Sequence, residues 1–250
     1  MDSNKLTLSL WNEVKQQTQD AVTRINQRNE DSVNGRIIPE DDHLAIATGS
    51  RMKLAVLFLD ICGFSSWDSS NHEEQNNVLR VLNLFITQMI HIAEHYGGTI
   101  EKNTGDGLMA YFPSTTNGDE AETTKKAVAS ALTMFYTNEN LLNPILNQGG
   151  FNPIRFRIGI DFGPVTIARV GAPRRFSSNV AIGAIANCAN KMLIEAGVNQ
   201  IVIGNELRSR LPLDWQQNTR FLKLSTRFRY IATNTLYPLY LYTSRWTRPL

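Results

Sequence analysis

The chain has 250 residues, a formal net charge of +2 and two cysteines. This length predicts one sizeable domain with an appendage. The charge gives no strong field, no run of about 18 apolar residues exists, and the first residues lack a signal-peptide pattern. We therefore expect a cytoplasmic protein with neither nucleic acid nor a membrane as a partner. Cys62 and Cys188 lie in apolar segments, which is typical of reduced packing residues.

Residues 5–28 are predicted to form an amphipathic helix. Its apolar positions recur near helical spacing: Leu6, Leu10, Val14, Ala21 and Ile25. Such a helix must rest on its own domain or on a partner subunit, and we favour packing in a dimer over binding to a membrane, because the polar face is not rich in Lys and Arg. Residues 29–42 are polar and predict a linker. We accordingly divide the chain into a helix and linker over 1–50 and a main domain over 51–250.

In the main domain, strand patterns alternate with helix patterns. Strands are predicted at 52–59, 99–103, 108–112, 156–161, 164–170, 200–203, 221–224 and 236–242, and helices at 70–96, 121–135, 183–196 and 205–210. Gly163 is expected to split two of the strands, and 141–153 and 171–179 are expected to be loops. This order predicts an α/β fold, an α+β sandwich of the ferredoxin-like β-α-β-β-α-β type, with helices on one face.

Two aspartates lie where predicted strands begin or end. Asp60 closes an apolar strand before a turn at Gly63, and Asp106 lies between two glycines in a predicted hairpin turn. If these strands are neighbours, the two carboxylates lie together and repel each other unless a hard cation lies between them. Mg²⁺ or Mn²⁺ held by carboxylates and phosphate oxygens is the usual solution.

The segments 58–65 and 102–111 resemble the two metal-binding motifs of class III nucleotidyl cyclases, F-x-D-I-x-G-F-[ST] and [KE]-x-x-G-D. The resemblance spans roughly residues 53–245 and implies a cyclase catalytic domain over 51–250. It implies two Mn²⁺ or Mg²⁺ ions per site, with Asp60, Asp106 and the Ile61 carbonyl as ligands. It further implies that the triphosphate contacts the turn formed by Gly63, Phe64 and Ser65.

Residues 183–192 resemble a third motif of this family, G-x-x-V-N-x-A-[SA]-R-M. Asn187 and Lys191 are four residues apart and project from one side of the predicted helix. The resemblance implies that Asn187 orients the ribose and that Lys191 replaces the arginine that stabilises the transition state. Lysine keeps the charge but lacks the planar fork of arginine, so either Lys191 acts alone or Arg174 or Arg175 assists it.

The choice of base departs from the adenylate and guanylate cyclase patterns. The resemblance places the two selector positions at Lys102 and Val180, and Val180 stands where adenylate cyclases have an aspartate that accepts from adenine. Guanine selection requires a glutamate at the first position, which is absent. The remaining resemblance is to the pyrimidine cyclases of the bacterial anti-phage Pycsar system.

We therefore predict a uridylate cyclase that makes cyclic UMP as a second messenger, since Lys102 can donate to a uracil carbonyl. The alternatives are a cytidylate cyclase, an adenylate cyclase and an inactive nucleotide-sensing domain. The resemblance also implies a homodimer with sites at the subunit interface, where Asp60 and Asp106 of one chain face Lys102, Asn187 and Lys191 of the other. A separate effector would respond to the product.

Overall fold

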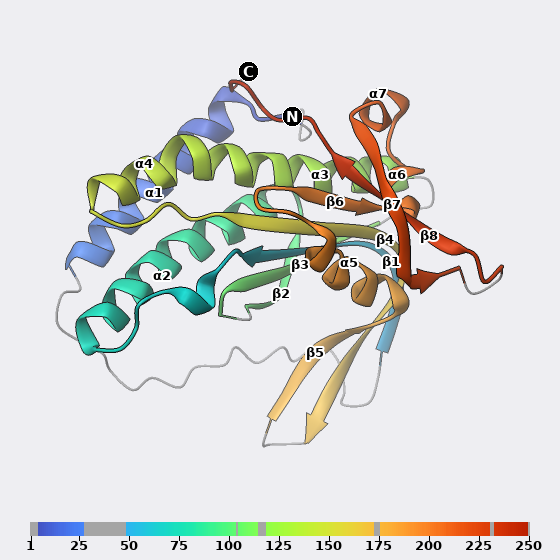
Figure 1. The fold of residues 1–250 in the computed structure, drawn as a ribbon, viewed down its shortest axis with the longest axis horizontal. Helices are drawn as coiled ribbons and strands as arrows, with labels where there is room; N and C mark the ends of the chain where they lie inside the picture. Colours follow the sequence, from blue (N-terminus) through green and yellow to red (C-terminus); the bar gives the residue numbers. More distant parts are fainter. Residues whose placement is uncertain are drawn as a thin grey trace.

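One eight-stranded sheet organises the computed structural model, which describes residues 5–27, 49–103, 105–114, 119–172, 176–230 and 233–249 (Figure 1). Seven strands follow the order β2-β3-β1-β4-β6-β8-β7, and β5 pairs with β4 alone. The strands are β1 Gly49–Ile61, β2 Thr99–Asn103, β3 Gly107–Pro113, β4 Phe156–Ala172, β5 Phe176–Ile182, β6 Ile201–Gly204, β7 Thr219–Arg229 and β8 Leu236–Tyr242. The predicted linker at 29–42, Arg174 and Arg175 lie outside the described residues.

The first half of the sheet has the predicted ferredoxin-like arrangement. In chain order it is built from β1, helix α2 (His72–His95), β2, β3, helix α3 (Glu120–Thr137) and β4. In space the strands run β2-β3-β1-β4, and each neighbouring pair is antiparallel. The β-α-β-β-α-β prediction is therefore confirmed.

Strand β1 lies at the centre of this half and is buried on both faces. Ala55, Leu57 and Leu59 belong to the core under α2 and α3, whereas Leu54 and Val56 pack with helix α5 (Ala184–Glu195). Successive side chains of a strand point to opposite faces, so the two sets mark two apolar layers. The expectation that helices cover one face only is thus wrong, because α5 covers the other.

Three local predictions fail for physical reasons. At 171–179, a segment expected to be a loop, β4 extends to Ala172 and β5 begins at Phe176, because the two strands continue to pair up to these residues. Strand β4 is continuous through Gly163, because this residue pairs with Leu54 and its missing side chain leaves room for Ile185 of α5. The segment expected to be a loop at 141–153 begins with a π-helical turn, Asn138–Leu142, and helix α4, Asn143–Gln148. Proline is tolerated in the first turn of a helix, so Pro144 does not prevent α4.

Two short helices follow β6: α6 (Asn205–Arg208) and α7 (Leu213–Gln216).

Helix α1 (Leu8–Gln27) packs its apolar face on its own domain, one of the two supports that the sequence left open. Its buried residues Leu10 and Val14 join the core formed with α2 and α3, and the Trp11 ring meets the Tyr136 ring edge-on at 5.1 Å between centroids. The Tyr96 hydroxyl of the α2 C-cap donates to the Lys5 carbonyl at 3.3 Å. The division of the chain at residue 50 stays a prediction.

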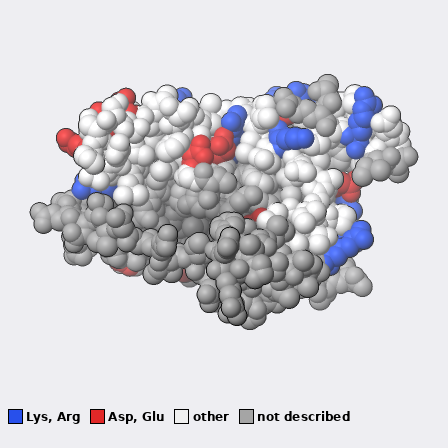
Figure 2. All heavy atoms as spheres, turned by 90° about the horizontal axis from the view of Figure 1, so that it is seen from below, with Lys and Arg blue, Asp and Glu red and all other residues white. Residues whose placement is uncertain are grey.

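The surface carries charges in small groups. Figure 2 shows one face of the molecule, on which the described acidic and basic side chains form separate clusters without one extended area of a single sign. Among the described residues, no helix is long and apolar enough to cross a membrane.

Truncation of α1 side chains tests whether the helix belongs to the core. Leu10→Ala removes a side chain that is 3% exposed, and should lower the free energy of unfolding by about 3 kcal/mol through lost burial and a residual cavity. Leu8→Ala in the same helix is the matched control, because Leu8 is 56% exposed and its loss should cost less than about 0.5 kcal/mol. Urea unfolding measures both; equal costs would contradict this packing.

Candidate functional site

The two predicted metal-binding aspartates lie on neighbouring segments at one end of the sheet. Asp60, near the end of β1, pairs in register with Gly107, the first residue of β3, and Asp106 directly precedes Gly107. The Ile61 N–H donates to the Asp106 carbonyl at 3.0 Å, which fixes the turn against β1. Both aspartates are partly exposed. The structure therefore brings together the two residues that the sequence predicted to be neighbours.

Arg157 on β4 is the third charged residue of this site, and the sequence reasoning missed it. Asp60 Oδ2 accepts from Arg157 Nε at 2.9 Å and from a terminal guanidinium nitrogen at 2.8 Å. The register of β1 with β4 places these two residues directly opposite each other. A signal was present, because Arg157 is a single charge inside the apolar run from Phe156 to Ile160.

The turn after β1 presents backbone donors next to Asp60. Gly63 has φ +74°, a left-handed conformation that favours glycine, and it precedes a short 3₁₀ turn at Phe64–Ser66. The Cys62 and Ser66 N–H groups donate to the Arg155 and Gly63 carbonyls. In the described part of the chain, the three N–H groups between them, at residues 63–65, have no acceptor. Consecutive free amides of this kind bind anions.

The donor set fits hard divalent cations. Among the described residues there is no group of three or more His, Cys, Asp and Glu side chains that could enclose a metal. Two carboxylates and a main-chain carbonyl are instead an incomplete oxygen shell, the kind that Mg²⁺ completes with phosphate oxygens and water. The Arg157 guanidinium on Asp60 confirms that a positive charge is accommodated at this point. Asp60, Asp106 and the Ile61 carbonyl could therefore hold such ions.

The predicted ribose and transition-state residues lie on α5, a different element from those that carry the two aspartates. Asn187 and Lys191 are exposed, while Cys188, Ala189 and Met192 are buried, as the helical spacing predicted. Lys191 Nζ lies 5.2 Å from the centroid of the Phe228 ring on β7. Within the described residues of one chain, no hydrogen bond or ion pair joins Asn187 or Lys191 to Asp60 or Asp106.

The two predicted base-selector positions lie on β2 and β5. The backbone of Lys102 pairs with Met109 of β3. Val180 pairs with Ala168 at the base of the arm formed by β4 and β5, which projects from the body of the molecule, and it is half-buried (Figure 1). An apolar, half-buried side chain at this position offers no hydrogen-bond acceptor to a base.

Neither cysteine has the properties of a nucleophile. Both thiols are free. Burial raises the pKa of Cys62, and burial raises the pKa of Cys188 to about 12. Both thiols are therefore protonated at neutral pH, which agrees with the prediction that they are packing residues.

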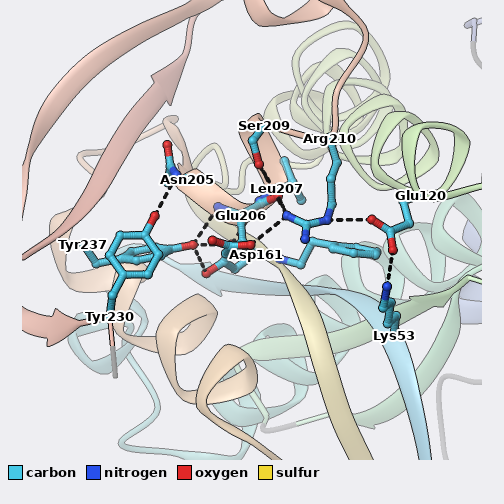
Figure 3. Close-up of polar contacts among 11 residues, drawn as sticks. Lys53, Glu120, Asp161, Asn205, Glu206, Leu207, Ser209, Arg210, Tyr230 and Tyr237 are labelled. Atoms are coloured by element: carbon cyan, nitrogen blue, oxygen red, sulfur yellow. Dashed lines mark hydrogen bonds and ion pairs between the residues drawn. The ribbon is translucent and has the colours of Figure 1, made fainter. Parts of the chain in front are cut away.

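A second polar cluster, also missed by the sequence reasoning, lies farther along β4 (Figure 3). Asp161 is fully buried, and its carboxylate accepts from the Tyr237 hydroxyl at 3.0 Å and from the Phe162 and Leu207 N–H groups. Burial raises the pKa of Asp161 to about 7, although these hydrogen bonds oppose the shift. The Tyr237 hydroxyl also accepts from the Glu206 N–H at 2.8 Å, so the cluster joins β4, α6 and β8.

A chain of ion pairs continues from Glu206 of this cluster to Glu120 of α3 and Lys53 of β1. Arg210 contacts Glu206 at 2.7 Å and Glu120 at 2.8 Å, and Lys53 contacts the other oxygen of Glu120 at 2.5 Å (Figure 3). The hydrogen bond from Lys53 is the main cause that lowers the pKa of Glu120. These contacts hold β1, α3 and α6 together, and none of them includes a predicted site residue.

Comparison with known proteins identifies the family of the chain. Residues 47–226 match the family described as the adenylate and guanylate cyclase catalytic domain. An adenylate cyclase of Anabaena cylindrica is 29% identical over 151 residues, which is 60% of this chain and 29% of that protein. A cytidylate cyclase of Escherichia coli is 26% identical over 183 residues, 70% of this chain and 39% of that protein.

A uridylate cyclase of Rhodovulum sp. (strain MB263) is 24% identical over 181 residues, 68% of this chain and 70% of that protein. The chain thus spans less than two fifths of the length of the adenylate and cytidylate cyclases above. Two solved structures have the same fold with a TM-score of 0.65. They are the guanylyl cyclase Cya2 (22% identity, 80% of this chain, 95% of that chain) and the adenylyl cyclase CyaB from P. aeruginosa (24%, 80% and 98%).

Asp161 should make the folded protein less stable as the pH rises. Its folded-state pKa of about 7 lies above the ~3.9 of an unfolded chain, so the folded state holds the proton more tightly. The stabilisation by the neutral carboxyl is fully present below pH ~4 and is lost as the pH rises to about 7. Asp161→Asn keeps the shape without titrating. Urea unfolding at pH 4.5 and 7.5 should show the variant gaining stability relative to the wild type at pH 7.5; an unchanged difference would contradict the shift.

Proposed function

The chain belongs to the adenylate and guanylate cyclase catalytic domain family, and on that premise we propose that it converts UTP into 3′,5′-cyclic UMP and diphosphate. The observation that carries a cyclase activity is the cluster at the end of β1. There Asp60 and the turn that bears Asp106 are fixed side by side, next to Arg157 and a turn of free amides. These are the groups that phosphoryl-type chemistry requires: carboxylates for cations, and donors for phosphate oxygens.

In the proposed reaction, the ribose 3′-oxygen attacks the α-phosphorus in line. The O3′–P bond forms, the bond to the β-phosphate oxygen breaks, and the 3′-hydroxyl proton passes to solvent. Asp60, Asp106 and the Ile61 carbonyl would hold Mg²⁺ or Mn²⁺, which lowers the pKa of the 3′-hydroxyl and neutralises charge on the diphosphate. The amides at residues 63–65 bind phosphate oxygens of the departing diphosphate.

Arg157 has a second role in this proposal. Its guanidinium now neutralises Asp60, and bound cations would take over that task. Released from Asp60, the planar guanidinium can donate to two phosphate oxygens at once. Because Arg157 lies directly opposite Asp60 on the neighbouring strand, we expect that a change of the Arg157 side-chain rotamer is enough for it to reach the phosphates.

The choice of a pyrimidine rests on Val180 and on the relatives. Val180 cannot accept from an adenine amino group, and removal of one partner of a buried polar pair costs roughly 1–3 kcal/mol. Lys102 would donate to a uracil carbonyl. Similarity to the Rhodovulum uridylate cyclase supports UTP, and similarity to the E. coli cytidylate cyclase favours CTP as the second candidate. We further propose that the cyclic nucleotide serves antiviral defence through a separate effector, as the Pycsar resemblance implies.

A homodimer would complete the site. In one chain, Asn187 and Lys191 are exposed on α5, and no hydrogen bond or ion pair between described residues joins them to the aspartate cluster. If two copies meet about a two-fold axis so that α5 of one chain faces the β1 end of the other, two equivalent sites form. Asn187 would then orient the ribose and Lys191 would leave Phe228 to stabilise the transition state.

Product analysis tests the activity. Purified protein with Mn²⁺ and ATP, GTP, CTP or UTP should yield cyclic UMP from UTP, identified by mass spectrometry, and Asp60→Ala should lower turnover by at least about a thousandfold because it removes a cation ligand. Glu94→Ala, at an exposed position of α2, is the control and should retain activity. Cyclic CMP as the main product would favour CTP, cyclic AMP would contradict the role of Val180, and nucleotide binding without a product would indicate an inactive sensor.

Mixing two inactive variants tests the shared site. Asp60→Ala and Asn187→Ala each remove one half of both sites, but a mixed dimer retains one intact site. Random pairing makes half of the dimers mixed, so about a quarter of the wild-type activity should return. Circular dichroism checks that both variants fold. No activity in the mixture, with mixed dimers detected by mass, would contradict sites formed between chains.

A further inference from the structure

A β-bulge interrupts β2 directly beside the first base-selector position. Ile100 pairs with Ala110 and Lys102 pairs with Met109, so Glu101 is the extra residue on β2. A bulge breaks the alternation of side chains along a strand and re-aims the extra residue. Glu101 is half-buried, and its side chain leaves the β2-β3 hairpin toward another strand.

That strand is β5, which carries the second selector position. Glu101 Oε1 accepts from the Ala181 N–H at 3.1 Å, across 80 residues of sequence. Strand β5 is paired with β4 on one edge only, so Ala181 presents this N–H from the unpaired edge. The carboxylate therefore satisfies an edge-strand donor and joins two strands that are not neighbours in the sheet.

The position of this bond gives it a specific consequence. Glu101 directly precedes Lys102, and Ala181 directly follows Val180. Helix α5, which carries Asn187 and Lys191, begins three residues after Ala181. This hydrogen bond therefore joins the segment of β2 that carries Lys102 to the segment of β5 that carries Val180, the two proposed base-selector positions.

We propose that Glu101 is a positioning residue for base selection: its carboxylate fixes β5 against β2 and so sets the width of the pocket between Lys102 and Val180. The proposal rests on the cyclase function above. Glu101 does not touch the reacting atoms, and it acts through the backbone of Ala181. A pocket of fixed width discriminates between bases by clashes and unpaired groups, whereas a pocket that can widen accepts larger bases.

The test compares three variants. Glu101→Ala removes the acceptor, Glu101→Gln keeps an oxygen at the same position, and Glu94→Ala is an exposed control. For Glu101→Ala we expect the ratio of kcat/KM for the preferred pyrimidine nucleotide over ATP to fall roughly tenfold, the size of one lost hydrogen bond. The fall should come mainly from KM, and Glu101→Gln should restore most of the ratio. A uniform loss of kcat for all nucleotides, or an unchanged ratio, would overturn the proposal.

Hydrogen exchange provides a readout that does not depend on turnover. The amide of Ala181 should exchange at least about tenfold faster in Glu101→Ala than in Glu101→Gln or Glu94→Ala, because it loses its acceptor. Equal exchange in all three variants would overturn the positioning role. If the wild type forms no cyclic nucleotide, the proposed function fails, and the exchange rates alone then decide whether Glu101 holds β5.

Discussion

The antiparallel pairing of β1 on both of its edges is the constraint on which the structure depends. β1 pairs with β3 from Leu54 to Asp60 and with β4 along its whole length. Because the register is fixed on both sides, the position of Asp60 relative to Gly107 and Arg157 is decided by backbone hydrogen bonds. A slip of one residue would turn Asp60 toward the core under α2 and α3 and would move Leu57 and Leu59 out of that core to the α5 face. The charged end of β1 is therefore fixed by the burial of its apolar length.

The fold places the charged cluster at the end of β1 and the exposed polar residues of α5 on different elements. The β1 end gathers the charged groups, Asp60, Asp106 and Arg157, at a partly exposed strand end where cations and phosphates can enter. The opposite apolar layer holds α5 close to β4 and leaves Asn187 and Lys191 toward solvent. Within the described residues of one chain, no hydrogen bond or ion pair joins these two groups of residues. In the proposed homodimer, a second copy supplies its α5 to the β1 end. Glu101 of β2, which accepts from the Ala181 N–H of β5, joins the segments of the two proposed base-selector positions.

The Asp161 cluster has a structural role, because its hydrogen bonds join three elements of the fold. It lies on the same strand as Arg157, but it is buried and joins β4 to α6 and β8. Together with the ion pairs of Arg210, it attaches the part of the sheet formed by β6, β8 and β7 to the ferredoxin-like part formed by β2, β3, β1 and β4. A perturbed pKa here accompanies structural attachment, because Asp161 is fully buried and its carboxylate accepts from the Tyr237 hydroxyl and from the Phe162 and Leu207 N–H groups.

The sequence by itself determined the elements and the local chemistry. Apolar periodicity predicted most of the strands and the long helices, and the glycine turns located Asp60 and Asp106, because both signals depend on neighbouring residues only. Only the tertiary structure decided which strands pair across long separations. It placed Arg157 on Asp60, Glu101 on Ala181 and α1 on its own core, and it made β4 continuous through Gly163. Such contacts depend on register and on the shape of distant side chains, which no local pattern encodes.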